Sequence, residues 1–432
     1  MAISTLVVGF LVSLLVLLVS APVAVTLAGV GMVGGLATIG WPIVDSLGSV
    51  VWGVQNEYSL TAIPLFILLG ELLLRSGLAD SMYIALSAWV GRLPGGLMHA
   101  NMTACALFAA TSGSSVATSA TVGTVALPAL RERNYPMAPT LGSLAAGGTL
   151  GILIPPSIAL LVYGSMTSVS IGKLFIAGII PGILLTLFFM AWIALSSRKY
   201  MATVREERII PLAEKLRLSR HLIPPFIVFL VVMGSIYGGI ATPTESAGLG
   251  VILVILMAWI MGRFNFGMLH QSFRQTAALT GMIALIIVGA FVLNVTLNAL
   301  DVPQQLSRAV LTTGITPTQF FLTLIVFYIV LGMFLEVLSM QVTTIPIVFP
   351  IAMALGIDPV WLGIFIVLMS EIALITPPVG MNIFVVQGVR RDGGPVGDVL
   401  RGVTPYVFML VIFTFVIWYV PEIVLWLPRH VS

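Results

Sequence analysis

Charged residues are scarce in this sequence: aspartate, glutamate, lysine and arginine make up only 8% of its 432 residues, against about a quarter in a typical soluble domain. Hydrophobic residues account for 59% and form long stretches that are almost free of charge. Many of these stretches approach the roughly 20 residues that a helix needs to cross a bilayer, so that about ten to twelve crossings fit. The alternating pattern of a membrane β-barrel is missing. We therefore predict an all-α polytopic membrane protein.

Cysteine is nearly absent as well. The single Cys105 excludes a disulfide within the chain, and we expect it to be a small buried apolar residue. Only four histidines occur, far apart in the sequence, which argues against a transition-metal site, although distant residues can meet in space. Neither a Walker A loop nor a GxSxG nucleophile elbow is present. We expect no organic cofactor, no ATP-driven pumping, no enzyme activity and no nucleic-acid partner.

Basic residues are missing before Arg75, so the apolar N-terminus lacks the basic region of a secretory signal peptide. We expect this segment to remain as the first membrane span. Seven basic residues lie between Arg198 and Arg220, which predicts that this loop is cytoplasmic. Following the spans outward from the loop places both termini in the periplasm. Only three basic residues are then left outside: Lys173, Arg308 and Arg429.

Two adjacent prolines, Pro155 and Pro156, lie inside an apolar stretch that is long enough to cross a membrane. Proline removes a backbone donor and clashes with the preceding turn, so we expect residues 154–156 to be unwound. Unwound backbone survives in hydrocarbon only where it lies against protein or a wet cavity. The break therefore indicates a functional position within the membrane.

The same break recurs 222 residues later, because LIPPS at Leu153 is answered by ITPPV at Ile375. Three pairs of prolines share nearly this spacing: Pro22 with Pro243, Pro155 with Pro377, and Pro181 with Pro405. We interpret this spacing as a duplication. It predicts a first repeat at 1–197 with its break at 151–157, a cytoplasmic basic linker at 198–220, and a second repeat at 221–432 with its break at 375–380.

The distribution of basic residues makes these two repeats inverted, and two parallel repeats are the alternative. Inverted repeats with breaks at corresponding positions are typical of secondary transporters, which bind substrate and ions at the broken segments. Carbonyls freed by the prolines can hold a cation, and half-helix N-termini attract an anion.

Two polar clusters predict re-entrant hairpins. The first, ATSGSSVATSAT, lies between apolar flanks that are each too short to span a membrane, and glycine with three serines makes a poor helix centre. A continuous helix that uses small residues for packing is the alternative. The point of this hairpin consists of Ser112, Gly113, Ser114 and Ser115. The second hairpin lies between Gly332 and Pro350, at the same spacing, and offers Glu336, Ser339, Thr343 and Thr344.

Four glutamates fall at or near membrane depth, where a charge costs about 2.5 to 3.5 kcal/mol. They are therefore not expected to face lipid. For Glu336, an ion ligand and a cap on neighbouring amides are equally open. For Glu71, Glu245 and Glu371 we favour a structural role.

Six ordered motifs resemble the large membrane subunit of the tripartite ATP-independent periplasmic (TRAP) transporters, and the resemblance covers almost the whole chain. They are SGSSVAT at Ser112, LGILIPPS at Leu150, LFIAGIIPG at Leu174, TPTESAG at Thr242, LGMFLE at Leu331 and TPPVGMN at Thr376. The resemblance implies an elevator-type sodium symporter of the bacterial inner membrane that imports a small organic acid. Its implied partners are membrane lipid, a periplasmic substrate-binding protein and a separate small four-helix membrane subunit.

The resemblance also implies two sodium sites and a substrate site. The first sodium site would comprise Ser112, Gly113, Ser114, Ser115, Gly151 and Pro155. The second would comprise Glu336, Thr344, Ile375, Thr376 and Pro377. Substrate would be bound by Ser114, Thr118, Ser157, Thr343 and Asn382. The sequence departs from the family pattern at Glu336, where aspartate is more usual, which puts direct ligation of an ion there in doubt.

Two other functions are alternatives. A proton-coupled organic-anion carrier would use Glu336 or Glu371 as its relay. A membrane enzyme that acts on a lipid-linked substrate is disfavoured, because no His/Asp/Cys constellation accompanies the polar hairpins. The sequence places no arginine at a predicted midplane position, where it could clamp a carboxylate.

Overall fold

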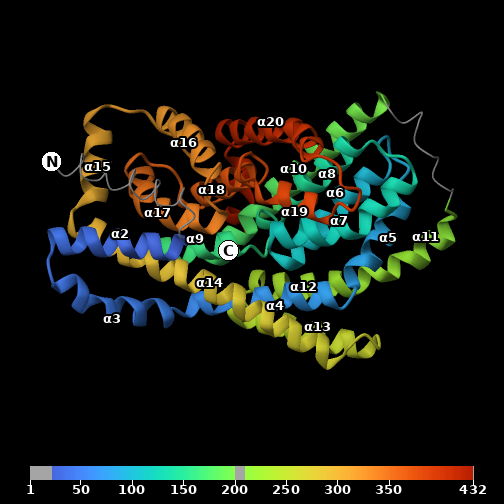
Figure 1. Ribbon diagram of the computed structural model, residues 1–432, viewed down its shortest axis with the longest axis horizontal. Coiled ribbons are helices and arrows are strands. Elements are labelled where there is room, and N and C mark those ends of the chain that lie inside the picture. Colours follow the sequence, from blue (N-terminus) through green and yellow to red (C-terminus); the bar gives the residue numbers. More distant parts are fainter. Residues whose placement is uncertain (1–21, 200–209, 432) are drawn as a thin grey trace.

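The computed structural model describes residues 22–199 and 210–431, and every regular element within these two ranges is a helix (Figure 1). The start of the predicted first span and the middle of the predicted linker lie outside the described residues. The first half contains α2 (Val23–Thr38), α3 (Pro42–Gln55), α4 (Ala62–Arg75), α5 (Leu78–Val90), α6 (Leu97–Ser112), α7 (Ser115–Glu132), α8 (Met137–Thr149), α9 (Ile158–Thr167) and α10 (Ile171–Ser196).

The second half begins with the short α11 (Leu212–Ser219). It continues with α12 (Ile223–Tyr237), α13 (Pro243–Ile260), α14 (Phe266–Ala299), α15 (Val302–Thr312), α16 (Pro317–Gly332), α17 (Val337–Ala354), α18 (Pro359–Leu374), α19 (Met381–Val389), α20 (Gly397–Tyr419) and α21 (Glu422–His430). Seven helical segments of the described ranges are long and apolar enough to cross a membrane, and five shorter apolar helices accompany them. The predicted all-α polytopic class is confirmed, whereas the predicted ten to twelve crossings stay a prediction beyond these seven candidate spans.

Helices α6 to α10 of the first half have counterparts of similar length in α16 to α20. Helix α17 begins at Val337, 222 residues after the start of α7 at Ser115, and the starts of α8 and α18 are separated by the same number of residues. Each set starts with two helices joined by a short turn, continues with a pair of helices separated by two prolines, and ends with a long helix. Both predicted helix breaks are thus confirmed, whereas the inverted orientation of the repeats stays a prediction.

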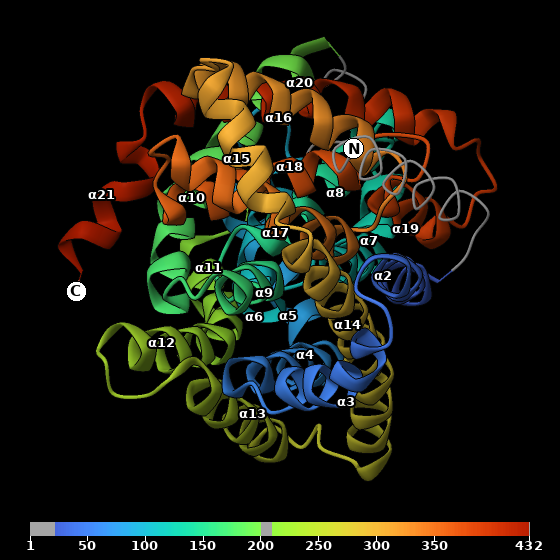
Figure 2. The ribbon, with the colours of Figure 1, turned by 90° about the vertical axis from the view of Figure 1, so that its left-hand side faces the viewer.

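The helices form two layers. Figures 1 and 2 show α3, α4, α12, α13 and α14 along one side of the molecule, and α16, α18 and α20 on the opposite side. The long α14 packs against α2 and α4, while α8 packs against α20. The hairpin arm α17 and the half-helix α9 lie between the two layers (Figure 2). Both hairpins and both breaks thus belong to one bundle that rests on the long helices.

Helices from different halves interlock within this bundle. The first-half helix α8 crosses the second-half helix α20 where Gly142 meets Gly402, and a Cβ atom on either glycine would overlap the partner helix's backbone carbonyl. Only glycine allows this approach. The second-half helix α18 likewise lies against α10 and α9, where Gly363 faces Leu174 and Tyr163. Each half therefore supplies packing surface for the broken helix of the other.

Candidate functional site

The tip of the first hairpin is a tight turn between α6 and α7. Gly113 has φ +64°, a left-handed conformation that glycine adopts without the penalty of a side chain. The hydroxyl of Ser114 caps α7 by accepting a hydrogen bond from the Ala117 amide at 3.4 Å. The hydroxyls of Ser112 and Thr118 form a hydrogen bond of 3.1 Å across the turn. The Gly/Ser composition therefore builds a closed tip in place of a continuous helix.

This tip rests directly on the first helix break. The Ser115 hydroxyl donates to the Thr149 carbonyl at 3.0 Å, at the end of α8. A Cβ atom on Gly113 would lie 2.8 Å from the Pro156 carbonyl, and one on Gly151 would lie 2.7 Å from that of Ser114. The predicted residues of the first site are thus packed backbone to backbone.

Beyond the first break, Ser157 starts α9 and accepts a hydrogen bond from the Leu160 amide at 3.2 Å. At the second break the chain is irregular from Ile375 to Gly380, and the Thr376 hydroxyl donates to the Ile372 carbonyl at 2.6 Å. Each break is therefore held by a local side-chain hydrogen bond.

The second hairpin tip is formed by Glu336, which caps α17. Its carboxylate accepts hydrogen bonds from the Leu338 and Ser339 amides at 3.2 and 3.3 Å, and from the Ser339 hydroxyl at 2.9 Å. Of the two roles open for Glu336 from the sequence, the cap is observed. The Thr344 hydroxyl lies 2.8 Å from that of Tyr328 on α16, so Thr344 is buried between the hairpin arms.

Both tips, and residues that border both breaks, line one cavity of 740 Å³, which we call the central cavity. From the first half it is lined by Ser112 to Ser115, together with Ile152 and Ile158 on either side of the break. From the second half it is lined by Glu336 to Ser339, with Leu374 and Met381 flanking the break. Helices α4 and α14 of the opposite layer complete the wall. Two regions about 222 residues apart in sequence therefore form a single chamber.

Among the described residues, the central cavity is lined by two carboxylates and by no lysine or arginine. Glu71 pairs with Arg75 one turn along α4, with Nε and Oε2 3.0 Å apart, and Arg75 also donates to Gln271 on α14 at 2.9 Å. Glu336 keeps its capping hydrogen bonds. The lining is otherwise mostly apolar, with hydroxyl groups gathered at the two tips. This electrostatic character suits a small cation better than an unaccompanied anion.

Several predicted site residues lie behind the cavity wall. Thr118, Ser157, Thr343, Thr344 and Asn382 are buried and are not part of the cavity lining. Neither are Gly151, Pro155, Ile375, Thr376 and Pro377. Asn382 donates to the Ala145 carbonyl on α8 at 3.2 Å, and its Oδ1 has no partner among the described residues. These residues support the tips and the breaks in this conformation.

Glu245 has the structural role expected of it, because its carboxylate accepts from the amide and hydroxyl of Thr242 at 2.8 Å in a capping box at the start of α13. Glu371 is different. It is fully buried on α18, and neither carboxylate oxygen has a partner among the described residues. A buried charge without a partner is costly, so a proton or a cation must accompany this carboxylate. Gln341 on the neighbouring α17 is equally buried and unpartnered.

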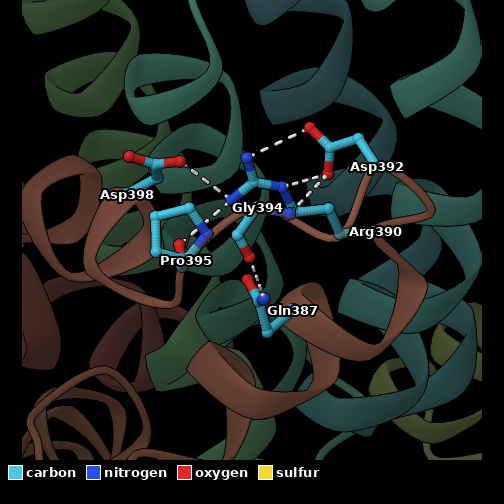
Figure 3. Close-up of polar contacts among 6 residues, drawn as sticks. All are labelled: Gln387, Arg390, Asp392, Gly394, Pro395 and Asp398. Atoms are coloured by element: carbon cyan, nitrogen blue, oxygen red, sulfur yellow. Dashed lines mark hydrogen bonds and ion pairs between the residues drawn. The ribbon is translucent and has the colours of Figure 1, made fainter.

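Arg390 fixes the loop that joins α19 to α20, a role the sequence did not reveal (Figure 3). Its guanidinium forms ion pairs with Asp392 and, at 2.9 Å, with Asp398. It also donates a hydrogen bond to the Pro395 carbonyl at 3.1 Å. The hydrogen bond from Arg390 lowers the pKa of Asp392 below its ordinary value. Gln387 donates to the Gly394 carbonyl at 2.7 Å. The half-helix after the second break is therefore anchored at its far end.

Comparison with known proteins places these features in a family context. The family model described as "Tripartite ATP-independent periplasmic transporter, DctM component" matches residues 6–423. The C4-dicarboxylate TRAP transporter large permease protein DctM of Pseudomonas aeruginosa is 38% identical over 389 residues, which are 89% of this chain and 90% of that protein. The sialic acid TRAP transporter large permease protein SiaM of Vibrio cholerae is 30% identical over 87% of each chain.

A solved structure shares the fold. The YdaH transporter of Alcanivorax borkumensis superposes with a TM-score of 0.63 at 16% identity, covering 94% of this chain and 97% of that one. At this low identity the similarity concerns the arrangement of helices alone.

Proposed function

Because this chain belongs to the family of the DctM component of tripartite ATP-independent periplasmic transporters, we propose that it imports a small organic acid with a carboxylate group across the bacterial inner membrane. The single observation that carries this proposal is the central cavity, where both hairpin tips meet residues that border the two helix breaks. Relatives are named for C4-dicarboxylates, sialic acid and ectoine, which supports a small polar substrate.

We further propose that sodium drives the import. Glu336 and the tip hydroxyls line the central cavity, Glu71 is paired with Arg75, and no described residue of the lining is basic, so an organic anion entering alone would find no compensating positive charge there. Sodium bound at the tips would supply this charge, which couples the binding of ion and substrate. Hydroxyl, carboxylate and backbone carbonyl oxygens are the groups that transporters offer to sodium near broken helices.

We propose that alternating access arises from a movement of one layer against the other. The bundle that carries the hairpins would move against the layer that contains α4, α13 and α14, as in an elevator, with a small four-helix membrane subunit enlarging the fixed layer. A periplasmic binding protein would deliver the substrate. In the proposed inverted topology, cysteines placed at the exposed positions Arg198 and Asp301 label from opposite sides of the membrane, and labelling of both from the periplasm would rule that topology out.

Reconstitution tests the whole proposal. The ligand is first identified by the thermal shift of the co-encoded binding protein with succinate, sialic acid or ectoine. Vesicles then receive this chain, the small subunit and the loaded binding protein, and uptake is measured with sodium or with choline. We expect uptake only with all three components and sodium. Full uptake of free substrate by the large subunit alone would refute the tripartite function.

Glu371 favours one second candidate, a proton-coupled carrier, because a fully buried carboxylate without a partner is suited to accept a proton. Proton coupling predicts uptake that persists in choline at constant pH and is lost in the Glu371→Gln variant. Uptake that stops in choline excludes this candidate.

A further inference from the structure

A second cavity, of 480 Å³, lies between α9, α14, α15 and α17, and we call it the outer cavity. Its volume falls in the range of about 300 to 1,000 Å³ that is usual for small-molecule sites. Within residues 22–199 and 210–431, its lining contains one positive charge and no acidic residue. The polar residues of the lining are Thr167, Asn294, Asn298, Gln304, Ser307 and Arg308.

The outer cavity continues the line of the central cavity, because three helices contribute to both. On α14 the lining passes from Ile286 in the central cavity to Phe291 in the outer one. On α17 it passes from Ser339 to Ile345, and on α9 from Ala159 to Met166. At about 1.5 Å of rise per residue, these gaps amount to roughly 8 to 11 Å. The linings of the two cavities are thus about two helical turns apart along the same three helices.

Arg308 is available to a ligand in the outer cavity. Its side chain is exposed, and no hydrogen bond or ion pair joins it to another described residue. Gln304, one turn earlier on α15, is exposed as well and has no hydrogen-bond partner in the described part of the chain. The Asn298 amide donates to the Asn294 side-chain carbonyl at 2.9 Å, which orders the opposite wall. A guanidinium with amides around it is the arrangement that binds a carboxylate through two parallel hydrogen bonds.

The fold itself does not require the polar residues that α15 contributes to the outer cavity. With the spacing of 222 residues that relates α7 to α17, the positions of Gln304, Ser307 and Arg308 correspond to Met82, Ala85 and Leu86 on α5. The space between α5, α6 and α7 is only 10 Å³ and is enclosed by side chains such as Met82 and Phe108. At these three positions the first half therefore carries apolar side chains where the second half presents polar and positively charged ones.

We propose that the outer cavity is a separate binding site for the carboxylate of the transported organic acid, occupied before the acid reaches the central cavity, with Arg308 as the group that recognises the anion. This inference rests on the proposed function. Arg308 supplies the positive charge that the lining of the central cavity lacks. The anion would thus be attracted in the outer cavity, and the cation would bind in the central cavity.

The test uses a reporter cysteine at Gln304→Cys in a Cys105→Ala background, in the purified full-length chain. Thiol reagents with a sulfonate or a trimethylammonium group report the local potential through the ratio of their reaction rates. Side chains four residues apart on a helix are about 6 Å apart, where a unit charge in water changes each rate about threefold in opposite directions. Arg308→Gln should therefore lower the sulfonate-to-ammonium ratio about tenfold. The matched control Lys173→Gln, which removes an exposed charge outside the cavity, should leave it unchanged.

Succinate provides the second readout. It should slow modification of the reporter severalfold when Arg308 is present and have no effect in Arg308→Gln. An unreactive thiol, an unchanged rate ratio or the same succinate effect in both variants would overturn the proposal. Protection by phosphatidylglycerol nanodiscs and not by succinate would overturn it in favour of a lipid headgroup. This assay needs neither sodium nor partners, so its result is independent of whether sodium-driven uptake is observed.

Discussion

Ser114→Ala should weaken sodium binding, whereas Ser157→Ala should not. The two serines are closely matched, because each starts a helix, with φ and ψ of −134° and 122° for Ser114 and −130° and 122° for Ser157. Each accepts a hydrogen bond from an amide three residues later, at 3.4 and 3.2 Å. They differ in position, since only Ser114 lines the central cavity.

Loss of the cap should cost about 1 kcal/mol of stability in either variant. Ser157 also donates to the Ile152 carbonyl, so its replacement is at least as destabilising as that of Ser114. Loss of a sodium ligand adds on the order of 1 to 3 kcal/mol, which shifts the sodium concentration for half-saturation by roughly five- to a hundredfold. This second effect should occur in Ser114→Ala alone.

The assay measures the melting temperature of the purified permease against sodium concentration, with choline chloride keeping the ionic strength constant and no substrate present. Binding to the folded state alone raises stability with the logarithm of ligand concentration above the dissociation constant. The Ser114→Ala curve should be displaced to higher sodium, while the Ser157→Ala curve should start lower and keep the wild-type midpoint. Equal displacement of both curves would refute the placement of a sodium site at the first hairpin tip.

Two further variants test the packing of the bundle and of its loop. Gly402→Ala should abolish the folded protein, because its Cβ atom would overlap the backbone of α8. In the control Gly397→Ala on the same helix, the added Cβ atom meets nothing within 4 Å, so this variant should fold normally. Size-exclusion profiles of the two purified variants measure the amount of folded protein. Arg390→Gln should raise hydrogen exchange severalfold in residues 391–396, unlike the exposed Arg391→Gln control. Since the pKa of Asp392 is lowered, the stabilising contact should persist at neutral pH and be lost only as the pH falls below the ordinary value of about 4.

Local chemistry explains what the sequence could predict. Prolines and the Gly/Ser tip act on their own backbone, so the breaks after Leu153 and Leu374 and the turn at Gly113 were predictable from the residues alone. The spacing of 222 residues then indicated which segments correspond. Their meeting in one cavity followed from the resemblance and not from local pattern.

Contacts that depend on tertiary packing were beyond the sequence. The contact between the hydroxyls of Thr344 and Tyr328 depends on how α16 packs against α17, whereas the predicted ion-binding role of Thr344 stays a prediction. Arg390 looked like one more cytoplasmic charge, although RRDGGPVGD contains both of its acidic partners. The outer cavity could not be predicted either, since its walls come from four helices and the role of Arg308 depends on all of them.

The glycine crossing of α8 and α20 has a consequence for how the protein is made. The ribosome synthesises α8 long before α20. Until α20 is made, the surface of α8 around Gly142 therefore lacks the helix that packs against it. The same applies in reverse to α18, which reaches a membrane where α10 is already present. Neither half can complete its bundle on its own. A first half synthesised alone would thus expose the surfaces that the second half normally covers. Two separately synthesised halves should become resistant to proteolysis only when they are produced together.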